Sequence, residues 1–267
     1  MKKLIALLLA TAMLFCMAAC GKNNDANNDK VQSGTQQTPD NEQALNTDEP
    51  KTRIVTDALG REVEIPAKVE SIVPLGNTPR MISYLGLADL AVGIEECEIA
   101  SSPIQAYAYP HVEKWSTLPN CGTNSMGETA YYPEQIIIAN PDVILSTDNT
   151  EVADNLQTQT GIPVVCVSQG TLFGDDYDQS LRILADVCGV SDRAEALIKF
   201  IDDSLADLAA RAATVTDEGK PTVLGAGATF KGSHSIDGVY TNYSVFEVLA
   251  ANDVAEEIAG ESGSSGV

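Results

Sequence analysis

A segment rich in polar and aromatic residues contains side chains suited to hold a small ligand. It carries Tyr107, Tyr109, His111 and the only tryptophan, Trp115. Flat rings give a large contact area at small entropic cost, and aromatic side chains often line ligand sites. The alternative is that these rings cover the edge of a sheet. We take Tyr107 and Tyr109 as candidate ligand contacts.

Arg80 is the candidate partner for a negatively charged group. It lies at the start of a predicted helix that follows a strand, and open α/β sheets bind ligands at the carboxyl ends of their strands. A guanidinium at this place suits an anionic ligand, such as one that carries carboxylates, although a plain surface arginine fits the same pattern. Lys231 and His234 follow a later strand and join the candidate ligand site.

The sequence does not display a catalytic site. It contains no G-x-S-x-G motif, and its two histidines, His111 and His234, offer few general bases near neutral pH. The glycines of residues 225–227 lack the third glycine of a dinucleotide motif, because Phe230 stands there. Bare zinc or manganese sites need several imidazoles and carboxylates, so a metal-ion site is disfavoured. We expect neither catalysis nor a cofactor.

The first 20 residues have the form of a lipoprotein signal peptide. Lys2 and Lys3 precede an apolar run over residues 4–15, and two alanines stand before Cys20. We expect Cys20 to carry a lipid, and two acyl chains anchor a protein stably to a membrane. A plain secretory peptide and a transmembrane anchor are the alternatives, but spanning takes about 20 apolar residues.

Composition predicts an exported protein on a tether. Residues 21–51 contain almost no large apolar side chains, so we expect a disordered linker there. The formal net charge of −22, with 16 basic against 38 acidic residues, excludes nucleic acid as a partner. We expect a monomer at the outer face of the cell membrane, or in the periplasm.

The body of the chain predicts an α/β fold. A hairpin over residues 52–65 with a glycine at its turn comes first. Strands and helices then alternate in units of about 30 residues, which predicts right-handed crossovers and a mostly parallel sheet in a first lobe of residues 52–168. The predicted strands are 71–75, 90–94, 142–146 and 162–167, and the predicted helices are 79–85, 133–139 and 151–160, with Thr78 as a cap.

The second half of the chain does not continue this alternation of strands and helices. Residues 169–219 predict a helical connector, because apolar residues recur at helical spacing over roughly six turns from Ser191. Residues 220–267 show one clear strand and one helix, while a lobe of this type needs about 100 residues. We therefore expect an incomplete second lobe and a truncated or partial gene product.

Four cysteines remain beyond the lipidated one. Cys97 and Cys121 flank a loop and are the better candidates for a disulfide, although spacing does not decide the pairing. Cys166 lies in a predicted buried strand and reads as a small core residue, and Cys188 completes the set.

The sequence also resembles a known family, the substrate-binding proteins of ABC importers for iron-siderophore, haem and cobalamin. The resemblance covers about residues 52–258. It implies two Rossmann-like lobes joined by one long rigid helix, and delivery of the ligand to a permease with its ATPase. It rests on VESIVP at 69–74, on residues 78–86 and 91–93, on YPEQI at 132–136 running into NPDVI at 140–144, and on GIPV at 161–164.

The resemblance assigns a docking role to Glu134, which would pair with an arginine of the permease. The alternative is structural, since an acid in the first turn of a helix is also stabilised by the helix dipole. The function implied is a lipid-anchored protein that captures an iron chelate or a corrinoid. A metal-ion-binding lipoprotein and a tethered hydrolase are the competing functions.

Overall fold

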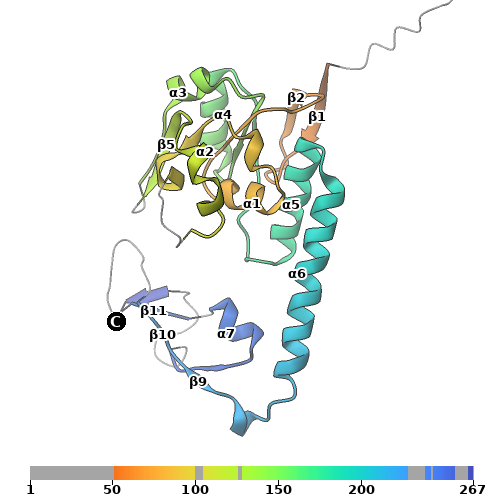
Figure 1. Cartoon of the computed structure of the whole chain (residues 1–267), viewed down its shortest axis with the longest axis vertical. Helices are drawn as coiled ribbons and strands as arrows, with labels where there is room; N and C mark the ends of the chain where they lie inside the picture. Colours follow the sequence, from red (N-terminus) through yellow and green to blue (C-terminus); the bar gives the residue numbers. More distant parts are fainter. Residues whose placement is uncertain are drawn as a thin grey trace, which may run out of the picture. The chain divides into compact units, whose positions relative to one another are not determined.

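The computed structural model describes residues 51–99, 105–125, 128–227, 238–241, 243–255 and 264–266. The first two strands, β1 (Thr52–Thr56) and β2 (Glu62–Pro66), form the predicted antiparallel hairpin (Figure 1). Val55 lies opposite Val63, and both are buried. Gly60 adopts a φ of 76° at the turn, a backbone conformation that glycine reaches without strain.

A parallel sheet forms the centre of the fold, as expected. Its strands β3 (Ile72–Pro74), β7 (Val143–Ser146) and β8 (Val164–Cys166) pair in the order β3-β7-β8, and every residue in them is buried. An isolated parallel bridge joins Ile72 to Ala91 on the other side of β3. The next sheet follows from there: β4 (Ile94–Glu95) pairs in parallel with β5 (Asn120–Ser125), which pairs with the antiparallel β6 (Glu128–Tyr131).

Short helices connect these strands. They are α1 (Thr78–Tyr84), α2 (Val112–Trp115), α3 (Pro133–Ala139) and α4 (Thr150–Thr160), with single 3-10 turns at Ala88–Leu90, Glu96–Ile99 and Tyr109–His111. Thr78 was expected to cap α1, and this prediction was wrong because Asn77 holds the cap position. The Thr78 hydroxyl instead donates to the Leu75 carbonyl at 2.8 Å.

Two longer helices follow, α5 (Asp175–Cys188) and α6 (Ser191–Ala212). Gly189 ends α5 in the left-handed conformation that favours glycine. The 22 residues of α6 match the stretch predicted from periodicity, and its buried residues are Ala194, Ile198 and Ile201. No helix in the described ranges is long and apolar enough to span a membrane. A role for α6 as the joint between two lobes remains a prediction.

The segment after residue 220 holds more strands than we expected. Instead of one strand and one helix, the described residues of this segment contain five short strands and the helix α7 (Ser244–Val248). Strands of two or three residues are too short to show an alternating pattern in the sequence. The strands are β9 (Thr222–Val223) paired in parallel with β12 (Asn252–Asp253), and an antiparallel sheet of β10 (Gly225–Ala226), β11 (Gly238–Tyr240) and β13 (Ser264–Gly266), after a 3-10 turn at Asp217–Gly219.

The candidate disulfide between Cys97 and Cys121 is not formed. Cys121 is a free, fully buried thiol. It packs against Gly93, where any side chain would collide with the Cys121 sulfur. Cys166 is also a free, buried thiol within β8, as predicted from its strand.

A buried ion pair holds the hairpin against the sheet. The Asp57 carboxylate accepts hydrogen bonds from the guanidinium of Arg61 at 2.7 and 3.0 Å, from the amides of Leu59 and Arg61 at 3.0 Å, and from the Cys166 amide at 3.2 Å. Arg61 also donates to the Val164 carbonyl at 2.8 Å and to Asp154 at 2.7 Å. Side chains from the hairpin turn therefore bind β8 and α4 together.

Glu95 is a second buried acid, at the end of β4. Its Oε2 accepts the amide of Gly76 at 2.6 Å, while its buried Oε1 has no partner among the described residues. Burial raises the pKa of Glu95 from an ordinary value of 4.5 to about 7. Gly76 is required here because it adopts a φ of 64° and because a side chain would collide with the Thr147 hydroxyl.

We predict that Asp57→Ala lowers the free energy of unfolding by about 3 to 5 kcal/mol, because it leaves Arg61 and the Cys166 amide without their buried partner. Urea unfolding followed by circular dichroism measures the change. The control is Lys68→Ala, which breaks the fully exposed pair with Glu70 and should change stability little. Equal effects of the two substitutions would contradict the central role of Asp57.

Glu95 should make the protein less stable as the pH rises. Its folded pKa lies above the unfolded value, so the favourable contribution is complete below pH 4.5 and is lost as the pH rises through about 7, by on the order of 3 kcal/mol. Glu95→Gln should therefore reduce the loss of stability between pH 5 and pH 8. Urea unfolding at several pH values tests this, and an unchanged pH profile in the variant would refute it.

Candidate ligand-binding site

The carboxyl edge of the parallel sheet brings three loops together. In the sheet, β3 lies between β7 and the segment at Ala91. After β3 the chain first forms the neighbour at Ala91, and it later returns on the other side of β3 to form β7. Open α/β sheets form a crevice at such a switch point. The loops meet there through Asn77, whose amide nitrogen Nδ2 donates to Gln169 at 2.9 Å and whose backbone amide donates to the Thr147 hydroxyl at 3.3 Å.

A small cavity of about 110 Å³ opens beside these loops. It combines amide side chains, a single cation and apolar groups, which is the mixture expected of a small-molecule site. Its lining residues are Asn77, Arg80, Met81, Gln169, Gly170, Leu172 and Tyr177.

Arg80 is half-buried and reaches this cavity from α1. All six arginines of the chain lie in the described ranges, and five of them bond to neighbouring side chains or carbonyls. Arg80 makes no hydrogen bond or ion pair with a described residue. Its guanidinium carbon instead lies 5.1 Å from the centroid of the Tyr107 ring, within the range of a cation–π contact. The structure thus brings together two of the residues singled out in the sequence.

Glu98 is a member of this group that sequence reasoning missed. It is 3% exposed, and its Oε1 accepts the hydroxyl of Tyr107 at 2.9 Å. Burial raises the pKa of Glu98, while the bond from Tyr107 and the charge of Arg80 oppose the rise. Glu98 belongs to an acidic run in the sequence, and such a run predicts a solvated surface rather than a buried carboxylate.

The other aromatic candidates of this segment do not line the cavity. Tyr109 is 51% exposed and does not line the cavity. Trp115 is fully buried, stacks against His111 at 5.0 Å between ring centroids, and donates its indole N–H to the Ala88 carbonyl at 3.3 Å. The ring of Trp115 therefore belongs to the core and does not line the cavity. Lys231, His234 and Cys20 lie outside the described residues.

Glu134 lies away from the cavity, in the first turn of α3. Its side chain is exposed and forms no ion pair within the described part of the chain. Of the three consecutive isoleucines in this helix, only Ile136 is buried, whereas Ile137 and Ile138 are 49% and 67% exposed. Successive helical residues point about 100° apart, so three neighbours cannot all face the sheet.

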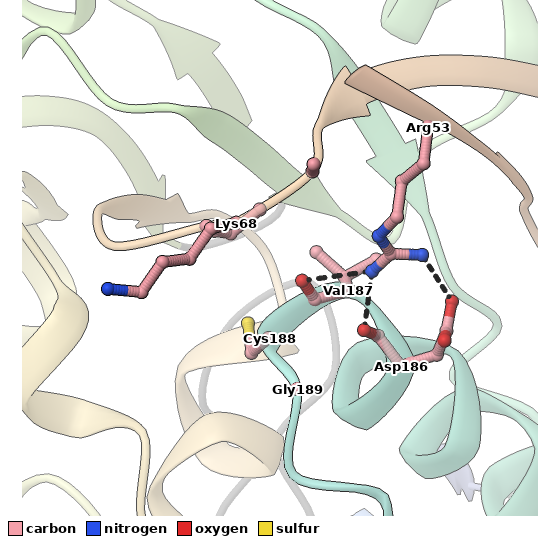
Figure 2. Close-up of a pocket in the computed structure, with 8 residues that line it drawn as sticks. Arg53, Lys68, Asp186, Val187, Cys188 and Gly189 are labelled. Carbon is pink, nitrogen blue, oxygen red and sulfur yellow. Dashed lines mark hydrogen bonds and ion pairs between the residues drawn. The ribbon is translucent and has the colours of Figure 1, made fainter. Parts of the chain in front are cut away.

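A second cavity, of about 480 Å³, lies between the hairpin and the end of α5. Figure 2 shows that Arg53, which lines this cavity, bonds to the last residues of α5. Arg53 donates to the Asp186 carboxylate at 2.9 Å and to the carbonyls of Asp186 and Val187 at 2.6 and 3.3 Å. Lys68 extends away from this group (Figure 2). Because Arg53 satisfies the last carbonyls of α5, we assign this cavity a structural role.

The acidic side chains that the structure describes near the site do not form a cluster of metal ligands. Over the described ranges, no group of three or more histidine, cysteine, aspartate or glutamate side chains could hold a metal ion. The acids near the site are spread instead over separate contacts. Glu95 binds the Gly76 amide, Glu98 binds Tyr107, and Asp148 accepts the hydroxyls of Tyr131 and Ser146.

Comparison with known proteins agrees with this fold. The ABC transporter substrate-binding lipoprotein YvrC of Bacillus subtilis is 25% identical over 224 residues, which are 82% of this chain and 61% of YvrC. A periplasmic solute binding protein from Veillonella parvula matches with a TM-score of 0.62 at 22% identity, over 81% of this chain and 63% of that one. The chain thus spans less than two thirds of the length of both.

Two further structures share the fold at lower identity. The molybdate-binding protein MolA of Haemophilus influenzae matches with a TM-score of 0.59 at 18% identity, over 80% of this chain and 69% of MolA. The heme binding protein HmuT matches with a TM-score of 0.53 at 20% identity, over 89% of this chain and 72% of HmuT. At such identities the likeness concerns the fold alone.

A family model decides the assignment. The model of the periplasmic binding protein family matches residues 85–265, which include β7 and β8 of the central sheet, both long helices and most of the segment after residue 220. The chain therefore belongs to the periplasmic binding protein family, and the resemblance to this family in the sequence is confirmed.

Proposed function

We propose that this protein captures an anionic iron chelate, such as a siderophore complex or haem, or a corrinoid, and delivers it to an ABC importer. The observation that carries the proposal is the guanidinium of Arg80, which faces a cavity at the carboxyl edge of the sheet and has no ion pair among the described residues. An oxyanion of the ligand would supply the hydrogen-bond acceptors that Arg80 lacks. Tyr109, Lys231 and His234 remain proposed contacts.

The size of the cavity keeps a second ligand class in view. Sites for drug-sized ligands measure about 300 to 1,000 Å³, whereas this cavity measures about 110 Å³. It would serve either as one wall of a larger cleft or as the seat of a small oxyanion. MolA, which shares the fold, was solved with molybdate, so a titration panel should include molybdate beside the chelates.

Anchoring and partners form part of the same proposal. A lipid on Cys20 would hold the protein at the outer face of the membrane, and the linker of residues 21–51 would let it reach a permease with its ATPase. The protein would act as a monomer and without catalysis, with Glu134 as its docking acid. A metal-ion-binding lipoprotein and a tethered hydrolase are the competing functions. Binding of a free divalent ion, or turnover of a chromogenic ester, would favour one of them.

Arg80→Ala should weaken ligand binding about tenfold or more, because a charge-assisted hydrogen bond contributes about 1.5 to 3 kcal/mol. Calorimetric titration with ferric siderophores, ferric citrate, haem, cobalamin and molybdate measures the affinities. The matched control is Arg211→Ala, which removes an exposed arginine paired with Asp207 on α6. Unchanged affinity for every ligand that the unmodified protein binds would remove Arg80 from the site.

Glu134→Ala should slow uptake and leave ligand binding in solution unchanged, because Glu134 is exposed and does not line the cavity. Uptake is measured in vesicles that contain the permease and its ATPase, and the effect should be larger at low salt. Glu151→Ala is the control, since Glu151 is an exposed acid in the first turn of the neighbouring helix α4. Reduced ligand affinity in Glu134→Ala would overturn the docking assignment.

A further inference from the structure

Three side chains from separate segments form a row of contacts that ends at the cavity. Glu98 comes from the 3-10 turn after β4, Tyr107 from the segment that precedes the 3-10 turn at Tyr109–His111, and Arg80 from α1. Glu98 bonds to the Tyr107 hydroxyl at 2.9 Å, and the Tyr107 ring contacts the Arg80 guanidinium at 5.1 Å. Of the three, only Arg80 lines the cavity.

The ring of Tyr107 binds Arg80 without using its hydrogen-bond donors. A cation–π contact engages the flat face of a guanidinium, and the N–H groups radiate from its edge. The contacts of Arg80 agree with this, since it donates no hydrogen bond to a described residue while it lies over the ring. The ring thus restrains the cation and leaves its donors available.

Glu98 fixes the ring in turn. The Tyr107 hydroxyl is directed to the Glu98 carboxylate, so it is already engaged as a donor. The other carboxylate oxygen of Glu98 is buried and has no partner among the described residues. The negative charge of this carboxylate favours a cation on the far side of the ring, because charges attract more strongly where water is excluded.

We propose that Tyr107 and Glu98 are positioning residues, which hold Arg80 at the cavity with its N–H edge free for a carboxylate or other oxyanion of the ligand. The role assigned to Tyr107 thus differs from the direct ligand contact expected from the sequence. The ligand part of this inference rests on the proposed function, whereas the positioning of Arg80 does not need a ligand.

Nuclear magnetic resonance tests the positioning in the ligand-free protein. Protons held over the face of an aromatic ring resonate upfield, so the Nε–H proton of Arg80 should be displaced upfield, with its signal identified by its loss in Arg80→Gln. Tyr107→Leu should abolish the displacement, Tyr107→Phe should retain it, and Tyr109→Leu is the control that should not alter it. A resonance that is the same in the protein and in Tyr107→Leu would overturn the contact.

Glu98→Gln and Glu98→Ala test the hydrogen bond between Glu98 and Tyr107. Glutamine retains an acceptor for the Tyr107 hydroxyl, so the Arg80 Nε–H signal should stay close to its original position. Alanine removes the acceptor, and the signal should move toward the position seen in Tyr107→Leu. If Glu98→Ala has a native circular dichroism spectrum and the Arg80 Nε–H signal is unchanged, Glu98 is not a positioning residue for Arg80.

A double-mutant cycle with ferric citrate as the probe tests the consequence for binding. Tyr107→Leu should weaken binding about 2- to 30-fold in the unmodified protein and should have no further effect in Arg80→Gln. An equal loss in both backgrounds would show that Tyr107 acts on the ligand directly and would overturn its positioning role. If the unmodified protein binds no ferric citrate, the result contradicts the proposed function for this chelate. The positioning of Arg80 is then tested by its resonance in the ligand-free protein.

Discussion

The hydrogen bonds between β3 and β7 are the interaction on which the candidate site depends. These strands pair in parallel with Ile72 opposite Val143, and the same ladder continues to β8. Parallel pairing places the carboxyl ends of the strands at one edge, so the loops carrying Asn77, Thr147 and Gln169 meet although they are far apart in the sequence. α1 begins at the same edge and brings Arg80 to it. Without this pairing, the residues that line the cavity would not lie at the same edge of the sheet.

Buried carboxylates divide into two kinds around this sheet. Asp57 receives five hydrogen bonds from the hairpin and β8, which satisfy both of its oxygens. Glu95 and Glu98 each keep one buried oxygen without a partner in the described part of the chain. A fully satisfied acid serves the fold, whereas an incompletely satisfied one is costly and persists where its charge has another use. Glu95 lies next to Gly76 and Glu98 is near Arg80, so both of these acids lie beside the candidate site.

Much of the fold could be predicted from the sequence, because its signals are local. The hairpin, α3 and α6 follow from turn glycines, an initial proline and helical spacing of apolar residues. Most of the strands after residue 220 could not be predicted, since two or three residues carry no period. For the site, Arg80 and Tyr107 could be identified by type and position. Glu98 could not, because only the tertiary fold turns one acid of a charged run inward, and the burial of Trp115 depends on packing in the same way.

The thiols of Cys121 in β5, Cys166 in β8 and Cys188 in α5 share one chemical consequence of their burial. Burial raises the pKa of Cys121 to about 11 and of Cys166 and Cys188 to about 12. The thiolate is the form that reacts with oxidants and disulfides, so at neutral pH almost none of the reactive species is present. In the folded protein these three thiols are therefore poor nucleophiles toward external disulfides and oxidants at neutral pH.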